Sequence, residues 1–333
     1  MRLSIHKLVL SLALLFLFFI LMLGWDQDTF TNRLLSKLVG TGIAIDEEIP
    51  RPEYRSTSHQ VYWTGDIESI DLKESSGLAS STRREGLLWS INDSGSEPAI
   101  FGLSKSGAHL GKWIVAGVEA NDWEGMDSFK TEDKHYLLIG DTGDNFRSRK
   151  EVSFLVIEEP LLDEDVREVT VSWQTKFSFP EGPRDVEAVA VDLRGKRAIF
   201  LNKRELPLCL YSVPLFPVDE KITATEIAEL VAVPRYRPAL ENLYGRTARY
   251  LGLPTGMDLF GNRLLVTTYR NAYLYDYSAL SEPPEEISLP YAGQREAITF
   301  GFESGEFAYV SRERKKGTQV ADIFEIRFSR QSN

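Results

Sequence analysis

The chain has 333 residues, of which 38 are basic and 49 are acidic, and its net charge is −11. This length exceeds one ordinary single-core domain and fits two domains or one large repeat array. The acidic balance argues against nucleic acid as a partner, because neutralising phosphates takes a surplus of Lys and Arg. The single cysteine, Cys209, excludes an intramolecular disulfide and a cysteine-based zinc site.

An apolar run without any charge occupies residues 8–24. It is at the short end of what spans a bilayer, and Trp25 follows it where an interfacial aromatic residue would lie. Two basic residues and no acidic residue precede the run, which places the N-terminus in the cytoplasm. We therefore predict a signal anchor, one transmembrane helix, at residues 1–25. A cleaved signal peptide is the alternative, although the run is long for one and no A-x-A-like site follows it.

The rest of the chain divides into a connector and a folded domain. Residues 26–58 are predicted to be a membrane-proximal connector, because Pro50 and Pro52 interrupt regular structure near its end. From residue 59 onward, short β-rich runs alternate with Gly, Pro, Asn and Asp, and no long helical period is present. Residues 59–333 are therefore predicted to form an all-β domain, in which Cys209 lies in the core.

A short pattern recurs in this domain: a polar residue, then Gly or Ala, then an aliphatic residue or Met. Its copies lie at residues 76–79, 124–127, 187–190, 255–258 and 296–299. Apolar strands that end in polar residues follow the copies at 89–93, 137–141, 199–203, 264–268 and 307–312. A third strand follows in each unit, and a weaker fourth in all but the last. Four short strands per unit, with a small residue on the innermost strand, are typical of a β-propeller.

We predict a β-propeller of five blades. The fifth unit lacks a fourth strand because the chain ends soon after its third, so the isolated strand at residues 59–65 is expected to complete it. Pairing the two ends of the domain in this way closes the ring and leaves no large open edge. Six blades is the alternative, because the units are long for a propeller, but the sequence holds no sixth copy of the innermost pattern.

Polar residues should converge on one face of such a ring. The starts of the innermost strands and the ends of the second strands open on the same face, so their side chains are expected to surround one mouth. The innermost strands supply Glu124, Glu187 and Glu296, the candidate catalytic residues. Oxygen-rich side chains suit Ca²⁺, which takes 6 to 8 oxygen ligands. The candidate metal ligands are Asp122, Asp141, Asp144 and Asp185.

Basic residues are predicted on the opposite side of this mouth, where they would hold a phosphate or carboxylate. The candidate ligand-binding residues are Lys203, Arg204, Arg270 and Arg312. A purely structural interpretation stands beside this one: Asp and Asn are common in turns, and the glutamates could pair with Arg184, Arg295 and Lys203. The Arg- and Tyr-rich segment 235–250 is either a lid or an ordinary solvated loop. No histidine has metal-ligand spacing, so zinc and histidine-dependent triads are disfavoured.

Six motifs together resemble a known group of proteins. They are SGLA at 76–79, NDSG at 92–95, DWEG at 122–125, GDTGDN at 140–145, DVEA at 185–188 and REAI at 295–298. Over roughly residues 60–328 the chain resembles exported bacterial β-propeller proteins of uncharacterised function. It is more distantly similar to the esterase-like phytase propellers, which have six blades.

The phytase resemblance implies calcium bound by mouth carboxylates and phosphate held by Lys and Arg. The positions to which these roles would transfer are Asp122, Glu124, Asp141, Asp185, Glu187, Lys203, Arg270 and Arg312. Propellers also serve binding alone, so the fold does not decide the function.

Two functions follow from these features. The first is a binding protein anchored in the bacterial inner membrane, with its propeller in the periplasm or extracytoplasmic space. Its mouth would bind a small anionic ligand or an envelope protein, with a divalent cation such as Ca²⁺ as the bridge. The alternative is a Ca²⁺-dependent phosphoesterase. Because no nucleophile–base pair can be named in the sequence, binding is favoured and the enzymatic question stays open.

Overall fold

The computed structural model describes residues 54–55, 59–162, 167–205, 207–230, 252–290, 295–302, 304–312 and 321–329. All of them belong to one compact unit, Pro50–Asn333. Within these residues the structure is all-β, with strands and no helix, and hence no helix that could cross a membrane. The predicted anchor at residues 1–25, most of the connector at 26–58 and the segment 235–250 lie outside the described residues.

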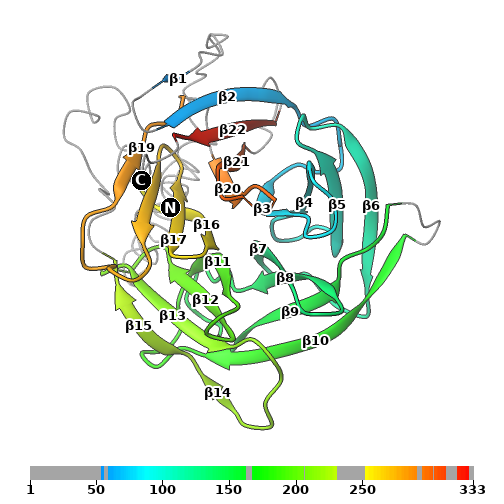
Figure 1. Ribbon diagram of the computed structural model, residues 1–333. Coiled ribbons are helices and arrows are strands. Elements are labelled where there is room, and N and C mark those ends of the chain that lie inside the picture. Colours follow the sequence, from blue (N-terminus) through cyan, green and yellow to red (C-terminus); the bar gives the residue numbers. More distant parts are fainter. Residues whose placement is uncertain are drawn as a thin grey trace, which may run out of the picture. The chain divides into compact units, whose positions relative to one another are not determined.

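The repeated sequence pattern forms the innermost strands of a ring (Figure 1). These strands are β3 (Ser75–Ser80), β7 (Trp123–Lys130), β11 (Val186–Asp192), β16 (Pro254–Phe260) and β20 (Arg295–Phe300). Each contacts the next one along the chain, and β20 contacts β3. Small residues allow this approach, since a Cβ on Gly125 would lie 2.5 Å from the Val189 side chain.

Each innermost strand begins an antiparallel meander that runs outward. The second strands are β4 (Leu87–Asn92), β8 (His135–Asp141), β12 (Arg197–Asn202), β17 (Arg263–Thr268) and β21 (Phe307–Arg312). The third strands are β5 (Ala99–Ser104), β9 (Val152–Glu158), β13 (Cys209–Pro214), β18 (Ala272–Asp276) and β22 (Asp322–Phe328). The fourth strands are β6 (His109–Ala116), β10 (Glu168–Ser178), β15 (Thr225–Glu229) and β19 (Glu285–Ile287). This β-propeller-like arrangement confirms the all-β prediction.

The last meander is completed by an N-terminal strand. Strand β2 (His59–Asp66) pairs antiparallel with β22, with Trp63 opposite Phe324. The sequence predicted this pairing for residues 59–65. Two short strands lie at sheet edges: β1 (Tyr54–Arg55) pairs with β2, and β14 (Ile222–Thr223) pairs with β10.

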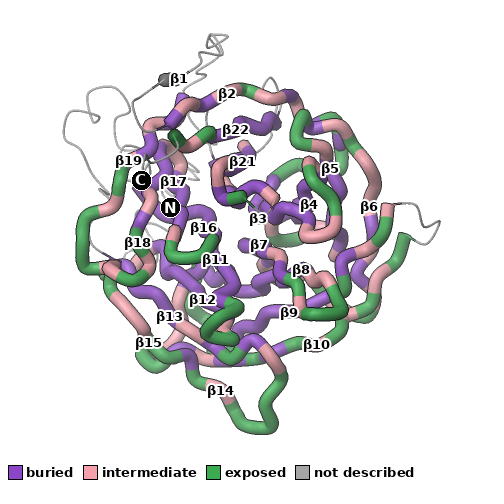
Figure 2. The backbone as a smooth tube through the Cα atoms, viewed as in Figure 1, coloured by how far each residue is buried: buried purple, intermediate pink, exposed green. Residues whose placement is uncertain are grey.

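The hydrophobic core lies between neighbouring sheets. Trp89 and Trp113 of the first sheet pack with Leu155 of the second, and Phe154 of the second packs with Phe200 of the third. Cys209 is buried in the latter cluster, as predicted. The innermost strands are therefore buried almost throughout, whereas exposed residues of β10 alternate with half-buried or buried ones (Figure 2). The innermost strands contact one another around the centre of the ring, so polar side chains on them lie close together.

Candidate functional site

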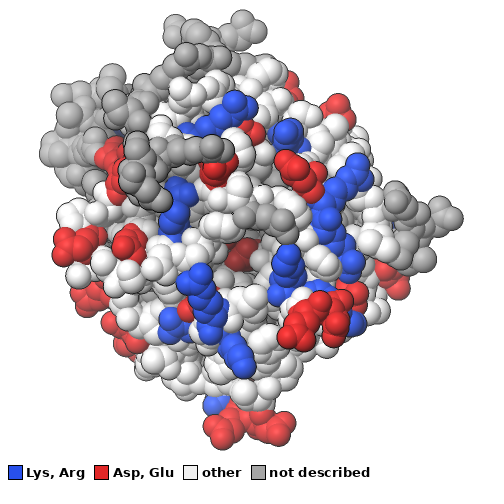
Figure 3. All heavy atoms as spheres, viewed as in Figure 1, with Lys and Arg blue, Asp and Glu red and all other residues white. Residues whose placement is uncertain are grey.

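Three carboxylates gather where the innermost strands begin. Asp93 directly follows β4, Asp122 directly precedes β7, and Glu124 is the second residue of β7. One carboxylate oxygen from each lies within 4.8 Å of the other two. Figure 3 shows acidic atoms at the bottom of the central hollow. We call Asp93, Asp122 and Glu124 the carboxylate cluster.

Two members of the cluster have carboxylate oxygens without partners among the described residues, and one of these oxygens, Oδ1 of Asp122, is fully buried. Glu124 is only 5 % exposed, yet within the described part of the chain its carboxylate has no hydrogen bond or ion pair. The Oδ1 atom of Asp122 is also buried and accepts no hydrogen bond there. Burying charged oxygens in this way costs free energy unless they gain a partner or a proton. The cluster is therefore suited to a cation.

The pKa values of the cluster reflect this environment. Burial, followed by the charges of Glu187 and Asp93, raises the pKa of Glu124 well above its usual value. Burial, followed by the charges of Asp93 and Asp185, raises the pKa of Asp122 to about 7. Without a cation, the cluster thus binds protons more tightly than isolated carboxylates do.

A glycine closes one side of the cluster. The backbone N–H of Gly143, in the β8–β9 loop, donates to the carbonyl oxygen of Asp122 at 3.2 Å. A Cβ at this position would lie 2.5 Å from the carboxylate of Asp122 and 2.7 Å from Oε1 of Glu124. Any larger residue would displace these two side chains.

Asp141 and Asp144, both predicted metal ligands, form bonds that shape the same loop. Oδ1 of Asp141 accepts hydrogen bonds from Nη2 of Arg149 at 2.9 Å and from the backbone N–H of Asp122 at 3.1 Å. The Asp144 carboxylate accepts the backbone N–H groups of Ser148 and Arg149, at 2.9 and 2.8 Å. These two side chains position the loop around the cluster, and neither belongs to the cluster itself.

The fourth predicted metal ligand, Asp185, is completely buried. Its Oδ1 atom accepts the backbone N–H of Asp144 at 3.1 Å, and its Oδ2 atom pairs with Nε of Arg204 at 2.5 Å. Of the predicted ligands, the structure thus places Asp122 in the cluster, and it places Asp141, Asp144 and Asp185 in the framework around it.

A buried ion pair lies beside the cluster. Nζ of Lys203 pairs with Glu187 and also donates to the hydroxyl of Tyr269 at 2.9 Å. Burial lowers the pKa of Lys203, but the charges around it, that of Glu187 foremost, raise the pKa well above normal, so Lys203 is protonated. Burial raises the pKa of Glu187 to about 7 even though Lys203 opposes this. The charge of the partly exposed Glu296 also acts on Lys203.

The predicted ligand-binding cations have carboxylate partners in most cases. Lys203 pairs with Glu187 and Arg204 with Asp185, as described above, and Nη2 of Arg312 lies 2.8 Å from Asp322. Arg270 is half-buried, and its carbonyl oxygen accepts a hydrogen bond from Arg295 at 2.9 Å. An anion at the mouth would therefore compete with internal carboxylates for these cations.

The alternative interpretation of the glutamates predicted ion pairs with Arg184, Arg295 and Lys203. The structure contains the pair between Lys203 and Glu187. Arg184 pairs instead with Glu181, at 3.4 Å. Arg295 is almost completely buried and donates to a backbone carbonyl. None of these pairs involves Glu124, which lies in the carboxylate cluster.

Sequence reasoning left Asp93 and Gly143 out of the candidate metal site. The repeat contains a signal for Asp93, because Asn92, Asn202 and Thr268 occupy equivalent positions opposite the starts of their innermost strands. The residues that follow them are Asp93, Lys203 and Tyr269, and all three are polar residues at the mouth. This column places Asp93 at the mouth, but only the coordinates show that its carboxylate approaches those of Asp122 and Glu124. The contact made by Gly143 likewise requires coordinates.

No protein-family model matches the chain, and no curated protein matches it. Among solved structures, the major allergen Mala s 1 of Malassezia sympodialis is 9 % identical, with 82 % of this chain and 96 % of that chain covered and a TM-score of 0.49. A gluconolactonase from Xanthomonas campestris is 10 % identical, with coverages of 81 % and 90 % and a TM-score of 0.43.

The calcium-binding protein regucalcin from Agrobacterium tumefaciens is also 10 % identical, with coverages of 80 % and 95 % and a TM-score of 0.42. At such values, what these proteins bind or catalyse says nothing about this chain. The resemblance to exported bacterial propellers and to phytase propellers stays a prediction.

Proposed function

We propose that this chain is a membrane-anchored, five-bladed propeller that binds a divalent cation at Asp93, Asp122 and Glu124. The cation, Ca²⁺ foremost, would in turn bind an anionic ligand or an acidic group of an envelope protein. The contact of β20 with β3 and the pairing of β2 with β22 support a ring of five blades. The uncharged run at residues 8–24 supports the anchor and an extracytoplasmic location.

One observation carries the cation proposal: Glu124 is 5 % exposed and lacks a partner among the described residues, and its oxygen lies within 4.8 Å of oxygens from Asp93 and Asp122. Charged carboxylates at this distance repel one another in such a partly buried site. A hard cation removes that repulsion and supplies the missing partner. Because all three ligands are oxygens, Ca²⁺ suits the cluster better than a metal that prefers nitrogen or sulfur.

The ligand is proposed to reach the site through the cation. Three carboxylates provide fewer oxygens than the 6 to 8 that Ca²⁺ takes, which leaves coordination positions for water or for a ligand anion. The nearby Lys203 and Arg204 already have carboxylate partners. A phosphate or carboxylate that binds the cation does not need to break those ion pairs.

The test is a calorimetric titration of the full-length protein with Ca²⁺, together with thermal unfolding in Ca²⁺ and in chelator. Saturating Ca²⁺ should stabilise the protein by about 2.7 kcal/mol at a concentration of 100 Kd. Glu124→Gln and Asp93→Asn should each weaken binding at least about tenfold, because each removes a charged ligand. Asp133→Asn, in the exposed β7–β8 turn, is the matched control. Absence of saturable binding, or binding that both variants leave unchanged, would contradict the proposal.

A second candidate function is Ca²⁺-dependent phosphoester hydrolysis, and the observation that favours it concerns Glu187. Burial raises the pKa of this residue to about 7, which suits a general base at neutral pH. Its charge also acts on Glu124, which lies in the cluster. Glu187 would accept a proton from the water that attacks the ester. A phosphoester panel tests this: Ca²⁺-dependent turnover should disappear in Glu187→Gln, and absence of turnover in the unaltered protein leaves binding alone.

A further inference from the structure

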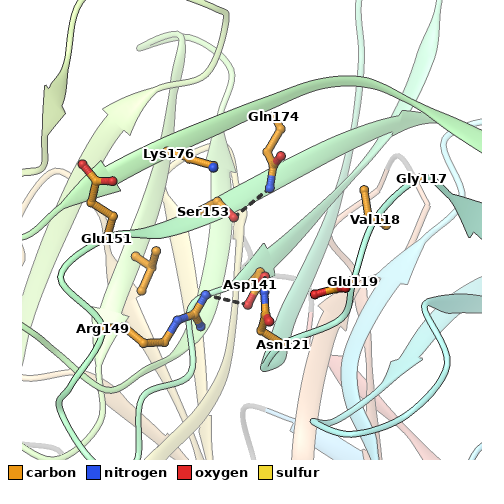
Figure 4. Close-up of a pocket in the computed structure, with 11 residues that line it drawn as sticks. Gly117, Val118, Glu119, Asn121, Asp141, Arg149, Glu151, Ser153, Gln174 and Lys176 are labelled. Carbon is orange, nitrogen blue, oxygen red and sulfur yellow. Dashed lines mark hydrogen bonds and ion pairs between the residues drawn. The ribbon is translucent and has the colours of Figure 1, made fainter.

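A polar pocket lies beside the mouth, outside the carboxylate cluster. Its volume is about 390 Å³, within the range of small-molecule sites. The pocket is bounded by the connection between β6 and β7, by the β8–β9 loop, and by strands β9 and β10 (Figure 4). Asp141 separates it from the cluster, because this residue lines the pocket and also bonds to the backbone of Asp122.

Most charges in the lining are already neutralised. Arg149 pairs with Asp141 at 2.9 Å, and Glu151 pairs with Lys221, outside the pocket, at 3.2 Å. Among the described lining residues, these pairs leave Glu119 and Lys176 as the remaining charged side chains, and their charges are opposite. A ligand with a large net charge would therefore gain little in this pocket.

Glu119 and Lys176 remain available for a ligand. Neither side chain has an ion pair or a side-chain hydrogen bond within the described residues. Lys176 lies on β10, whereas Glu119 lies in the connection between β6 and β7. In Figure 4 they occupy opposite sides of the pocket, with Ser153 and Gln174 near the Lys176 side and Asn121 near Glu119. The pocket thus has one negative and one positive end.

Between these ends the lining is polar and small. The Gln174 amide donates to the hydroxyl of Ser153 at 3.0 Å, which leaves the amide oxygen of Gln174 available for a donor group. Val118 and Val152 supply a limited apolar surface. None of the described residues that line the pocket is aromatic, so they offer a base or sugar ring no surface on which to stack.

We propose that this pocket binds a small dipolar organic ion of the size of a short peptide. Glu119 binds the ammonium group, Lys176 binds the carboxylate, and Gln174 and Ser153 hydrogen-bond the amide between them. The pocket binds this ligand without a cation in the carboxylate cluster, so the proposal is independent of the proposed Ca²⁺ site.

The test uses glycylglycine as the probe and follows binding to the full-length protein by NMR titration in the presence of chelator. N-acetylglycine lacks the ammonium group of the probe, and glycylglycinamide lacks its carboxylate, with little change in shape. Because an exposed ion pair contributes up to about 1 kcal/mol, each analogue should bind roughly threefold to fivefold more weakly than glycylglycine.

Two variants test which residue binds each end of the probe. Lys176→Gln should bind glycylglycine and glycylglycinamide equally, because the carboxylate no longer has a partner. Glu119→Gln should bind glycylglycine and N-acetylglycine equally. Lys134→Gln and Glu132→Gln, in the β7–β8 turn, should keep the preference of the unaltered protein. Absence of saturable glycylglycine binding, or selectivity that neither pocket variant changes, overturns the proposal.

Discussion

Asp141 holds the backbone of Asp122 and the side chain of Arg149 with one carboxylate oxygen, at 3.1 and 2.9 Å. Arg149 lines the polar pocket, and Asp122 belongs to the carboxylate cluster. The Asp141 side chain therefore connects the two proposed sites. Its negative charge also offsets the positive charge of Arg149 close to the cluster.

Replacing Asp141 should weaken cation binding without removing a ligand. Asp141→Asn keeps an oxygen for the Asp122 N–H but leaves the charge of Arg149 uncompensated, so the potential at the cluster becomes less negative. We expect the Kd for Ca²⁺ to rise about tenfold, consistent with one charge a few ångströms away in a partly buried site. Calorimetry measures this change.

Asp192→Asn is the control for this variant. Asp192, the last residue of β11, pairs in the same way with Arg197, the first residue of β12, at 2.8 Å. The two variants should lose similar stability, and only Asp141→Asn should lose affinity for Ca²⁺. Equal Kd values in both variants would show that Asp141 has no influence on the cluster.

Cation binding should depend on pH, because the cation-free cluster holds protons. The pKa of Asp122 is raised to about 7 and that of Glu124 is well above its usual value, so Ca²⁺ must displace protons below these pKa values. Affinity should therefore rise from about pH 6 to about pH 8, by up to about tenfold per unit for each proton released. Titration in two buffers with different ionisation enthalpies counts the protons. A proton count of zero at neutral pH would contradict the raised pKa values.

The same pKa values set the sign of the stability change in chelator. Because the folded state of the cluster binds protons more tightly than the unfolded chain, the cation-free protein should lose stability as pH rises above about 4, the usual carboxyl pKa, through the raised values. Glu124→Gln should flatten this part of the profile, measured by urea unfolding. If stability depends on pH with the same slope in the variant, other groups cause the effect. One such group is Asp258, because burial raises its pKa to about 6.

The buried Lys203–Glu187 pair should contribute an interaction free energy to the stability of the fold. Lys203→Met would leave Glu187 buried without its cation, and breaking a buried pair costs about 3 to 5 kcal/mol. Adding Glu187→Gln removes the unpaired charge, so the double variant should recover most of that loss. Urea unfolding of the two single variants and the double variant gives the interaction free energy. If the losses simply add, the pair has no net coupling.

Much of the fold could be predicted from the sequence because the repeat shows both where each strand lies and which strands must pack or pair with one another. Gly125 and Ala188 recur at the point where innermost strands approach closely, and apolar runs follow at regular positions. The strand at 59–65 had no partner within its own unit, and the last unit lacked a fourth strand, so the sequence predicted that the two would pair. The structure contains this pairing. Residues 1–25 carry an equally clear pattern, but they lie outside the described residues.

The site was less predictable, since the repeat shows which residues reach the mouth but does not show what they bind there. Asp122, Asp141 and Asp185 are chemically identical, yet Arg149 and Arg204 neutralise the second and third. The partners come from loops whose course depends on backbone bonds, such as those of the Asp144 carboxylate. The spacing of residues in the sequence does not show which aspartates pair with an arginine and which remain available for a cation.

Gly143 provides the most selective test of the carboxylate cluster. An alanine Cβ at this position would lie 2.5 Å from the carboxylate of Asp122 and 2.7 Å from that of Glu124. Both contacts involve the ends of side chains, which can rotate away, so Gly143→Ala should cost little stability, on the order of 1 kcal/mol. The rotation separates two of the three proposed ligands, and affinity for Ca²⁺ should fall at least about tenfold.

Gly195→Ala is the matched control, because a Cβ there would lie 2.5 Å from the carboxylate of Asp192 and 2.8 Å from Nε of Arg197, again at the ends of side chains. This glycine lies in the β11–β12 turn, away from the starts of the innermost strands. Both variants should unfold at similar urea concentrations, and calorimetry should find that Gly195→Ala alone keeps the Kd of the unaltered protein. If Gly143→Ala also keeps that Kd, the cation does not bind between Asp122 and Glu124, since the added methyl group occupies the space against which both carboxylates pack.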